Sequence, residues 1–220
     1  MKTLKIEMVH DVVCSWCSIG YVNLKQALRN LDIEADIYFL PYELNPDIGP
    51  KGEGIDDHLG RRYQWTQSKL REYRKHLLSV AKRAGVGMDF SKRTHYYNSN
   101  KAHRLMLWSE GYNRQQAMNE LLIDAYFKRG LEISNAQVLL DLVEQLGLDR
   151  SLAEHALTSD EVNQQLLFKQ KRVQQLGLTS VPAFILNENS LVSGSNSVEY
   201  FEQVILDLTK TIQPSLNIAN

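Results

Sequence analysis

The chain has 220 residues, 43% hydrophobic and 23% charged, a composition typical of a globular protein with a substantial core. A formal net charge of −1 provides no basic field for nucleic acid, so we expect no nucleic-acid partner. No apolar run approaches the roughly 20 residues of a membrane span, and residues 1–10 lack the apolar segment of a secretory leader. We therefore expect a cytoplasmic protein with no membrane partner.

The N-terminal part of the chain predicts a strand, a helix and a second strand. Residues 4–10 begin with alternating apolar and polar positions and predict a strand. Residues 11–14 predict a turn, residues 15–31 a helix with an apolar face, and residues 34–42 a second strand. Because a helix joins the two strands, we expect them to pair in parallel with a right-handed crossover.

The rest of the chain predicts a loop, a long helical block and a second β segment. Prolines and glycines follow closely in residues 43–56, which predicts a loop, whereas the periodicity from 58 to about 177 is helical almost throughout. After this block we expect a strand at 182–187, a strand at 191–194, a helix at 197–212 and a tail at 213–220.

This order of elements predicts an α/β protein whose sheet is assembled from both ends of the chain. One sheet domain with a helical insertion explains the pattern more economically than two tandem domains. The predicted sheet domain comprises residues 1–57 and 177–220, and the predicted all-helical insertion comprises residues 58–176. Within the insertion, Ser134 and Thr158 fit the capping-box pattern at the start of two helices.

The two cysteines of the chain, Cys14 and Cys17, lie where the first predicted helix follows the first strand. The unpaired N–H groups and the positive end of a helix N-terminus stabilise a thiolate, the reactive form of cysteine. A spacing of three residues places Cys17 within reach of Cys14 for a disulfide. We expect Cys14 to be exposed at the helix tip and to attack, and Cys17 to be more buried and to resolve the mixed disulfide.

Other roles for the cysteine pair are weaker alternatives. A disulfide across two residues closes too short a loop to stabilise a fold much, and buried structural cysteines would be chemically inert. A zinc site needs four ligands, and the histidines of this chain are scattered without ligand spacing, so we expect no metal. A C-x-x-C pair in a strand–helix–strand unit is more typical of redox catalysis.

Three further residues are candidates from their positions alone. Ser15 and Trp16 stand between the cysteines, and Trp16 should be partly exposed and able to touch a substrate. Pro182 follows Val181 at the start of the returning strand. The general frequency of X-Pro bonds favours a trans bond there, and a cis bond facing the cysteine pair is the functional alternative.

Further segments that carry information are Asp11–Gly20, Pro41–Pro46, Asn98–Leu105, Ala125–Gly130, Leu176–Pro182 and Val192–Ser195. In their sequence and order these segments resemble the DsbA family of the thioredoxin superfamily, and within it the FrnE-like group of dithiol–disulfide isomerases. The resemblance implies a thioredoxin fold with a helical insertion, a nucleophilic Cys14, a resolving Cys17 and a cis Pro182. The family often has proline where this chain has Ser15, which leaves the reduction potential open.

The resemblance also suggests where substrate binds. Asn98 and His103 belong to a matched helical motif and are candidates to line a substrate cleft, together with Val181 beside the proline. Packing between the insertion and the sheet is the alternative role for Asn98 and His103.

The same branch of the superfamily includes the 2-hydroxychromene-2-carboxylate isomerases and the kappa-class glutathione transferases. These enzymes use glutathione and typically carry serine at the position of Cys14. Because this chain keeps both cysteines, we predict a thiol–disulfide oxidoreductase or isomerase acting on protein or small-molecule thiols. A glutathione-dependent transferase or isomerase, and a non-catalytic binding module, are the alternatives. We expect no bound cofactor, with glutathione as a candidate co-substrate.

Overall fold

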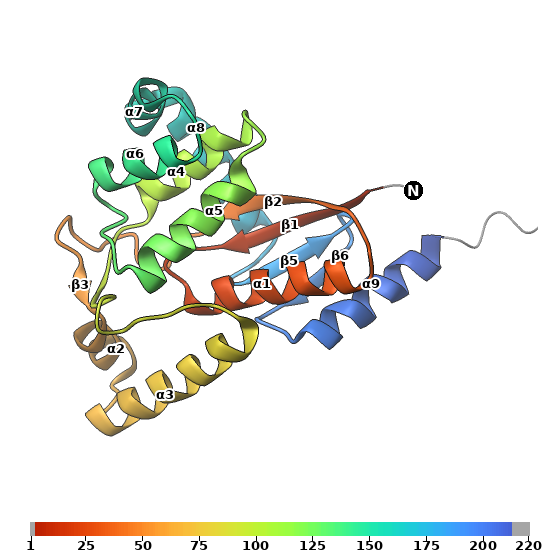
Figure 1. Cartoon of the computed structure of the whole chain (residues 1–220), viewed down its shortest axis with the longest axis horizontal. Helices are drawn as coiled ribbons and strands as arrows, with labels where there is room; N and C mark the ends of the chain where they lie inside the picture. Colours follow the sequence, from red (N-terminus) through yellow and green to blue (C-terminus); the bar gives the residue numbers. More distant parts are fainter. Residues whose placement is uncertain (1–2, 213–220) are drawn as a thin grey trace, which may run out of the picture.

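The computed structural model describes residues 3–212, and a mixed four-stranded sheet lies at its centre (Figure 1). The strands are β1 (Leu4–His10), β2 (Ala35–Pro41), β5 (Ala183–Leu186) and β6 (Ser190–Ser193), in the order β2-β1-β5-β6. β1 and β2 are parallel, whereas β1–β5 and β5–β6 are antiparallel. The sheet is therefore assembled from both ends of the chain, as predicted. The predicted tail at 213–220 lies outside the described residues.

Helix α1 (Ser15–Asn30) connects the two parallel strands and forms the predicted strand–helix–strand unit. Its apolar face buries Leu24, Ala27 and Leu28 in the main core beside the sheet. Helix α9 (Val198–Ile212) packs beside α1 and buries Phe201 and Ile205 in the same core (Figure 1). The packing of α1 against the sheet and against α9 fixes the N-terminus of α1 next to the carboxyl end of β1.

The segment between β2 and β5 is mostly helical. Its helices are α2 (Ile55–Tyr63), α3 (Gln67–Ala84), α4 (Asn100–Glu110), α5 (Gln115–Ile123), the π-helical turn η1 (Asp124–Lys128), α6 (Ala136–Gln145), α7 (Arg150–Thr158) and α8 (Asp160–Gln175). Helices α4 to α8 gather near β2, whereas α2 and α3 lie near the N-terminal end of α1 (Figure 1). Within residues 3–212, no helix combines the length and apolar character needed to cross a bilayer.

Two predictions about this segment need correction. Within the predicted loop 43–56, β3 (Glu53–Gly54) pairs with β4 (His95–Tyr96), and α2 begins at Ile55. The insertion is therefore not entirely helical, although β4 does not join the central sheet. Two-residue strands are too short to leave a periodic signal in the sequence. The division into 1–57, 58–176 and 177–220 stays a prediction, and its first boundary falls inside α2.

Two helix starts lie one residue later than the capping pattern predicts. Asn135, rather than Ser134, caps α6 by accepting the N–H of Gln137 at 2.9 Å. Ser159, rather than Thr158, caps α8 by accepting the N–H of Val162. Each predicted residue stands beside another side chain with a capping oxygen, so the local pattern does not choose between the two.

Candidate active site

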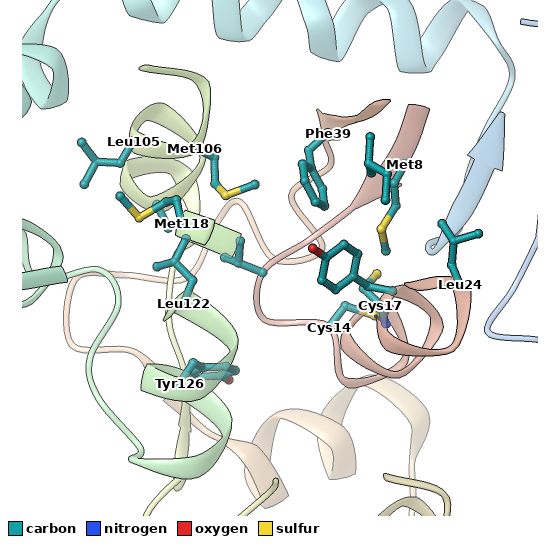
Figure 2. Packing of buried hydrophobic residues seen from close by; sticks show 14 of the residues in the cluster. Met8, Cys14, Cys17, Leu24, Phe39, Leu105, Met106, Met118, Leu122 and Tyr126 are labelled. Carbon is teal, nitrogen blue, oxygen red and sulfur yellow. Dashed lines mark hydrogen bonds between the residues drawn. The ribbon is translucent and has the colours of Figure 1, made fainter. Parts of the chain in front are cut away.

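Cys14 and Cys17 occupy the N-terminus of α1 (Figure 2). Cys14 is the N-cap residue, and its sulfur accepts the N–H of Cys17 at 3.4 Å. Its carbonyl oxygen accepts the N–H groups of Cys17 and Ser18 at 3.1 and 3.2 Å. The Cys14 sulfur thus lies at the positive end of the helix with a backbone N–H directed at it, an arrangement that stabilises a thiolate.

The two sulfurs differ in their surroundings in the predicted direction, but both are buried. Cys14 is 8% exposed and Cys17 2% exposed, so the expectation of an exposed Cys14 was wrong. Burial and the neighbouring Cys14 sulfur raise the pKa of Cys17 well above its usual value. Cys17 therefore stays protonated at neutral pH unless a base takes its proton.

Helix α3 covers the tip of α1. The indole N–H of Trp16 donates to the hydroxyl of Tyr73 at 3.2 Å, and Ile19 packs with Leu77 in a small core cluster. Trp16 and Tyr73 are 57 residues apart in the sequence. Periodicity indicates only local structure and cannot predict such a contact, which explains why the sequence predicted an exposed helix tip.

Ser15 and Trp16 lie in different environments. Trp16 is half-buried, as expected, with its ring 6.0 Å from that of His76. Ser15 is 6% exposed and lines a small internal cavity together with Tyr73, Arg93 and other residues of the covering segment. Of the two, Trp16 is therefore the better placed to touch a substrate in this arrangement.

Arg93 is a buried cation that the sequence did not indicate. Its side chain is 2% exposed and makes no ion pair with any carboxylate among residues 3–212. The guanidinium lies 4.7–5.3 Å from the ring centroids of Phe90, Tyr96, Tyr126 and Phe127. It also donates to the carbonyl of Val13, the residue before Cys14, at 3.4 Å. The guanidinium therefore places a buried positive charge, held among aromatic faces, beside the turn that leads to Cys14.

The Val181–Pro182 peptide bond is cis, as the family resemblance implies. Pro182 is buried against α1 at Gly20, where a Cβ would lie only 3.3 Å from the proline ring. Gly20 is three residues beyond Cys17, so the absence of a side chain there lets the start of β5 approach the redox helix closely. Val181 is half-buried and packs at the edge of the core.

The structure places His103 in the interior and Asn98 at the loop that follows β2. His103 is 2% exposed, and its Nε2 lies 3.4 Å from the carboxylate of Asp11, which is 1% exposed. Asn98 is half-buried and donates to the carbonyl of Pro46 at 2.9 Å. His103 therefore occupies the packed position between the helical segment and the sheet, whereas Asn98 fixes the loop that follows β2.

Two other features behind the cysteines were not assigned from the sequence. Asp11 accepts the N–H groups of Val13 and Leu44 at 3.2 and 2.7 Å, which fixes the turn leading to Cys14. The ring of His10 lies 5.5 Å from that of His103. Figure 2 shows Met8 and Phe39 of the sheet close to the cysteine pair, so these polar groups stand in an otherwise apolar core. The position of His10 and Asp11 shortly before the C-x-x-C pair was the only sequence feature that could have pointed to them.

The strand–helix–strand unit with two cysteines at the helix N-terminus, completed by the β5–β6 hairpin and α9, defines a thioredoxin-like α/β fold with a helical insertion. Residues 5–206 match the family of DSBA-like thioredoxin domains. The chain therefore belongs to this family of DsbA-like thiol oxidoreductases.

Individual relatives agree with this assignment. The chain is 25% identical over 211 residues to the uncharacterised protein YwbO of Bacillus subtilis, covering 94% of this chain and 98% of the relative. A probable DsbA oxidoreductase from Streptomyces coelicolor superposes with a TM-score of 0.86 at 22% identity, covering 99% of this chain and 94% of its own. A cytosolic disulfide reductase, DsbM from Pseudomonas aeruginosa with GSH, gives 0.64 at 19% identity, covering 94% and 99%.

A structure of 2-hydroxychromene-2-carboxylate isomerase gives a TM-score of 0.71 at 15% identity, covering 94% of this chain and 97% of its own. At these identities the superposed structures share the fold. The activity of this chain has to be argued from its own residues.

Proposed function

We propose that this protein is a thiol–disulfide oxidoreductase in which Cys14 is the nucleophile and Cys17 the resolving thiol. The observation that carries the proposal is the asymmetric pair at the start of α1. The Cys14 sulfur accepts a backbone N–H at the positive helix end, whereas the Cys17 thiol is deeper and has a raised pKa.

The reaction proceeds in two exchanges. The Cys14 thiolate attacks a substrate disulfide, forms a mixed disulfide and releases one substrate sulfur as a thiolate. Cys17 then loses its proton, attacks the Cys14 sulfur and releases the second substrate thiolate. The substrate gains two electrons and the protein becomes the Cys14–Cys17 disulfide. The reverse sequence oxidises a dithiol substrate.

Substrate binding involves the surface around Trp16 and Val181. The backbone N–H and C=O of Val181 have no hydrogen-bond partner within residues 3–212, so an extended substrate backbone has groups to pair with there. Trp16 supplies a half-buried aromatic face. Asn98 fixes the loop that follows β2, and the buried Ser15 and His103 act from within the protein.

We further propose a FrnE-like protein that works in the cytoplasm on protein or small-molecule thiols, with glutathione as a candidate co-substrate. The cytosolic disulfide reductase that shares the fold was solved with GSH, which supports this substrate class. A glutathione-dependent isomerase is the second candidate, because a 2-hydroxychromene-2-carboxylate isomerase also shares the fold. The presence of both cysteines favours the redox reaction.

Turbidimetric reduction of insulin by dithiothreitol tests the proposal. We expect the wild-type protein to accelerate insulin precipitation and the Cys14→Ser variant to be inactive. A parallel assay of glutathione conjugation to an electrophilic aromatic substrate tests the alternative. Conjugation that persists in Cys14→Ser, without insulin reduction by the wild type, would favour the glutathione-dependent enzyme. Inactivity in both assays would favour a binding module.

A further inference from the structure

Helix α3 is strongly basic, although the chain as a whole is close to neutral. Six lysines and arginines and one glutamate give the helix a formal charge of +5, against −1 for the whole chain. Neighbours neutralise two of the six cations, because Lys69 pairs with Glu72 and Arg74 pairs with Asp56. The other four form no ion pair within residues 3–212: Arg71, Lys75, Lys82 and Arg83.

These four cations lie on the exposed face of α3, and the opposite face of the helix packs on α1 and α2. Arg71, Lys75 and Lys82 are separated by four and by seven residues, so they form one line along the helix. At 1.5 Å per residue, this line is about 16 Å long.

Helix stability explains only part of this arrangement. Lys82 and Arg83 lie in the last turn, where cations interact favourably with the helix dipole. Arg71 and Lys75 are too far from that end to do so, and like charges four residues apart repel each other. The line of cations is therefore better explained by a negatively charged partner than by the stability of the helix.

The basic face borders the redox site. The hydroxyl of Tyr73 accepts the indole N–H of Trp16, and the ring of His76 lies 6.0 Å from the same indole. His76 is exposed and follows Lys75 directly in the sequence. Helix α3 lies at the margin of the molecule, so its outer face is accessible from solvent (Figure 1). A substrate that approaches Cys14 past α3 therefore meets a positive field.

We propose that the outer face of α3 binds an acidic polypeptide segment next to the substrate disulfide. The inference rests on the proposed function and names its substrate class, which is proteins with negatively charged residues near a reducible disulfide. The length of the line favours a polypeptide over a small anion. A tripeptide such as glutathione spans at most about 11 Å, whereas about five extended residues span the line of about 16 Å. The exchange at Cys14 is the one described above.

An attraction between opposite charges acts mainly on the rate of association and is screened by salt. At about 0.01 M salt the screening length is about 30 Å, which is longer than the line of cations, whereas at about 1 M salt it is about 3 Å. The advantage of an acidic substrate should therefore be large at low salt and disappear at high salt.

Three synthetic peptides test the proposal. They share one intramolecular disulfide and differ in a flanking run of about five residues, which are glutamate, glutamine or lysine. The reduced protein is mixed with each peptide, and acid-quenched samples give the second-order rate constant for loss of the peptide disulfide. At about 0.01 M salt we expect wild type to reduce the glutamate peptide about tenfold faster than the glutamine peptide, and the lysine peptide more slowly than either. At about 1 M salt the three rate constants should agree within about twofold.

Two variants of equal total charge locate the effect. The α3 variant combines Arg71→Gln, Lys75→Gln and Lys82→Gln. The control variant replaces by glutamine three exposed cations of the segment from α4 to α8: Lys101, Arg114 and Lys171.

We expect the α3 variant to lose the preference for the glutamate peptide and to reduce the glutamine peptide at the wild-type rate. The control variant should keep the preference. The proposal is overturned by the absence of a preference in wild type, by an equal loss in both variants, or by an α3 variant that keeps the preference.

A binding measurement separates this inference from the proposed function. Fluorescence anisotropy of a labelled glutamate peptide without cysteines detects docking in the absence of exchange. At low salt we expect equal binding to wild type and Cys14→Ser, and a loss of binding in the α3 variant. No binding to wild type, or tighter binding of a single-stranded oligonucleotide, would overturn the assignment of an acidic polypeptide. Failure of all three disulfide peptides to react would count against the proposed function instead, and anisotropy would still decide whether α3 is the docking face.

Discussion

The contact between Trp16 and Tyr73 should control how readily Cys14 reacts. Cys14 is only 8% exposed, so a reagent reaches its sulfur after α3, which covers the tip of α1, moves away. The Tyr73→Phe change removes the hydrogen bond from Trp16 but keeps the ring and its packing against Trp65. One such bond stabilises the closed arrangement by about 1 kcal/mol, which corresponds to a roughly fivefold change in the open population.

Timed alkylation of the reduced protein with iodoacetamide, followed by peptide mass spectrometry, measures the rate at each cysteine separately. We expect Cys14 to be labelled before Cys17 in every variant, and about fivefold faster in Tyr73→Phe than in wild type. Tyr200→Phe is the matched control, because Tyr200 is 49% exposed on α9, and it should leave both rates unchanged.

Two results would refute this reasoning. Equal labelling of Cys14 in Tyr73→Phe and wild type would show that the Trp16–Tyr73 contact does not limit access to the sulfur. Faster labelling of Cys17 than of Cys14 would reverse the roles assigned to the two thiols.

Three other changes test the packing and charge around the site. Gly20→Ala should lower stability by about 1 kcal/mol in urea titrations, because overpacking outweighs the helix propensity gained. The new Cβ would lie 3.1 Å from a core phenylalanine ring, whereas in the control Gly49→Ala the new Cβ has no neighbouring atom within 4 Å. A Gly20→Ala variant more stable than wild type would contradict this packing. Arg93→Met should lower the melting temperature of the reduced protein more than that of the oxidised protein, because only the reduced form gains from a cation near the Cys14 thiolate. Equal shifts in the two forms would show that Arg93 does not stabilise the thiolate. Burial lowers the pKa of His10, so below about pH 6.5 the unfolded chain binds a proton that the folded chain does not. The folded state is therefore destabilised as pH falls below about 6.5, by up to about 1.4 kcal/mol per pH unit, and this contribution to stability is fully present above that pH. His10→Gln should flatten this part of the stability curve, and identical curves would show that His10 does not contribute to it.

The sequence predicted the elements that local pattern determines. The four strands of the central sheet, the crossover helix and the position of the two cysteines follow from periodicity and spacing, and the structure has them within a few residues. The cis bond at Pro182 came from the family resemblance alone, since general frequencies favour trans.

Contacts between distant segments could not be predicted in this way. The cover over the tip of α1 depends on Tyr73 of α3, and the buried contact between His103 and Asp11 joins α4 to the turn after β1. Arg93 lies in an irregular segment between α3 and α4, where no periodic pattern marks its burial. Such features are set by how helices pack on the sheet, which local sequence does not encode.

Cys14 and Cys17 should form a reversible disulfide through a mixed disulfide on Cys14. Intact-mass and peptide analysis after equilibration with glutathione and its disulfide measures both species directly. We expect wild type to lose the mass of two hydrogen atoms without retaining glutathione, and Cys17→Ser to retain glutathione on Cys14. Two reduced thiols at every glutathione ratio, or an adduct on Cys17 in Cys14→Ser but none on Cys14 in Cys17→Ser, would contradict it.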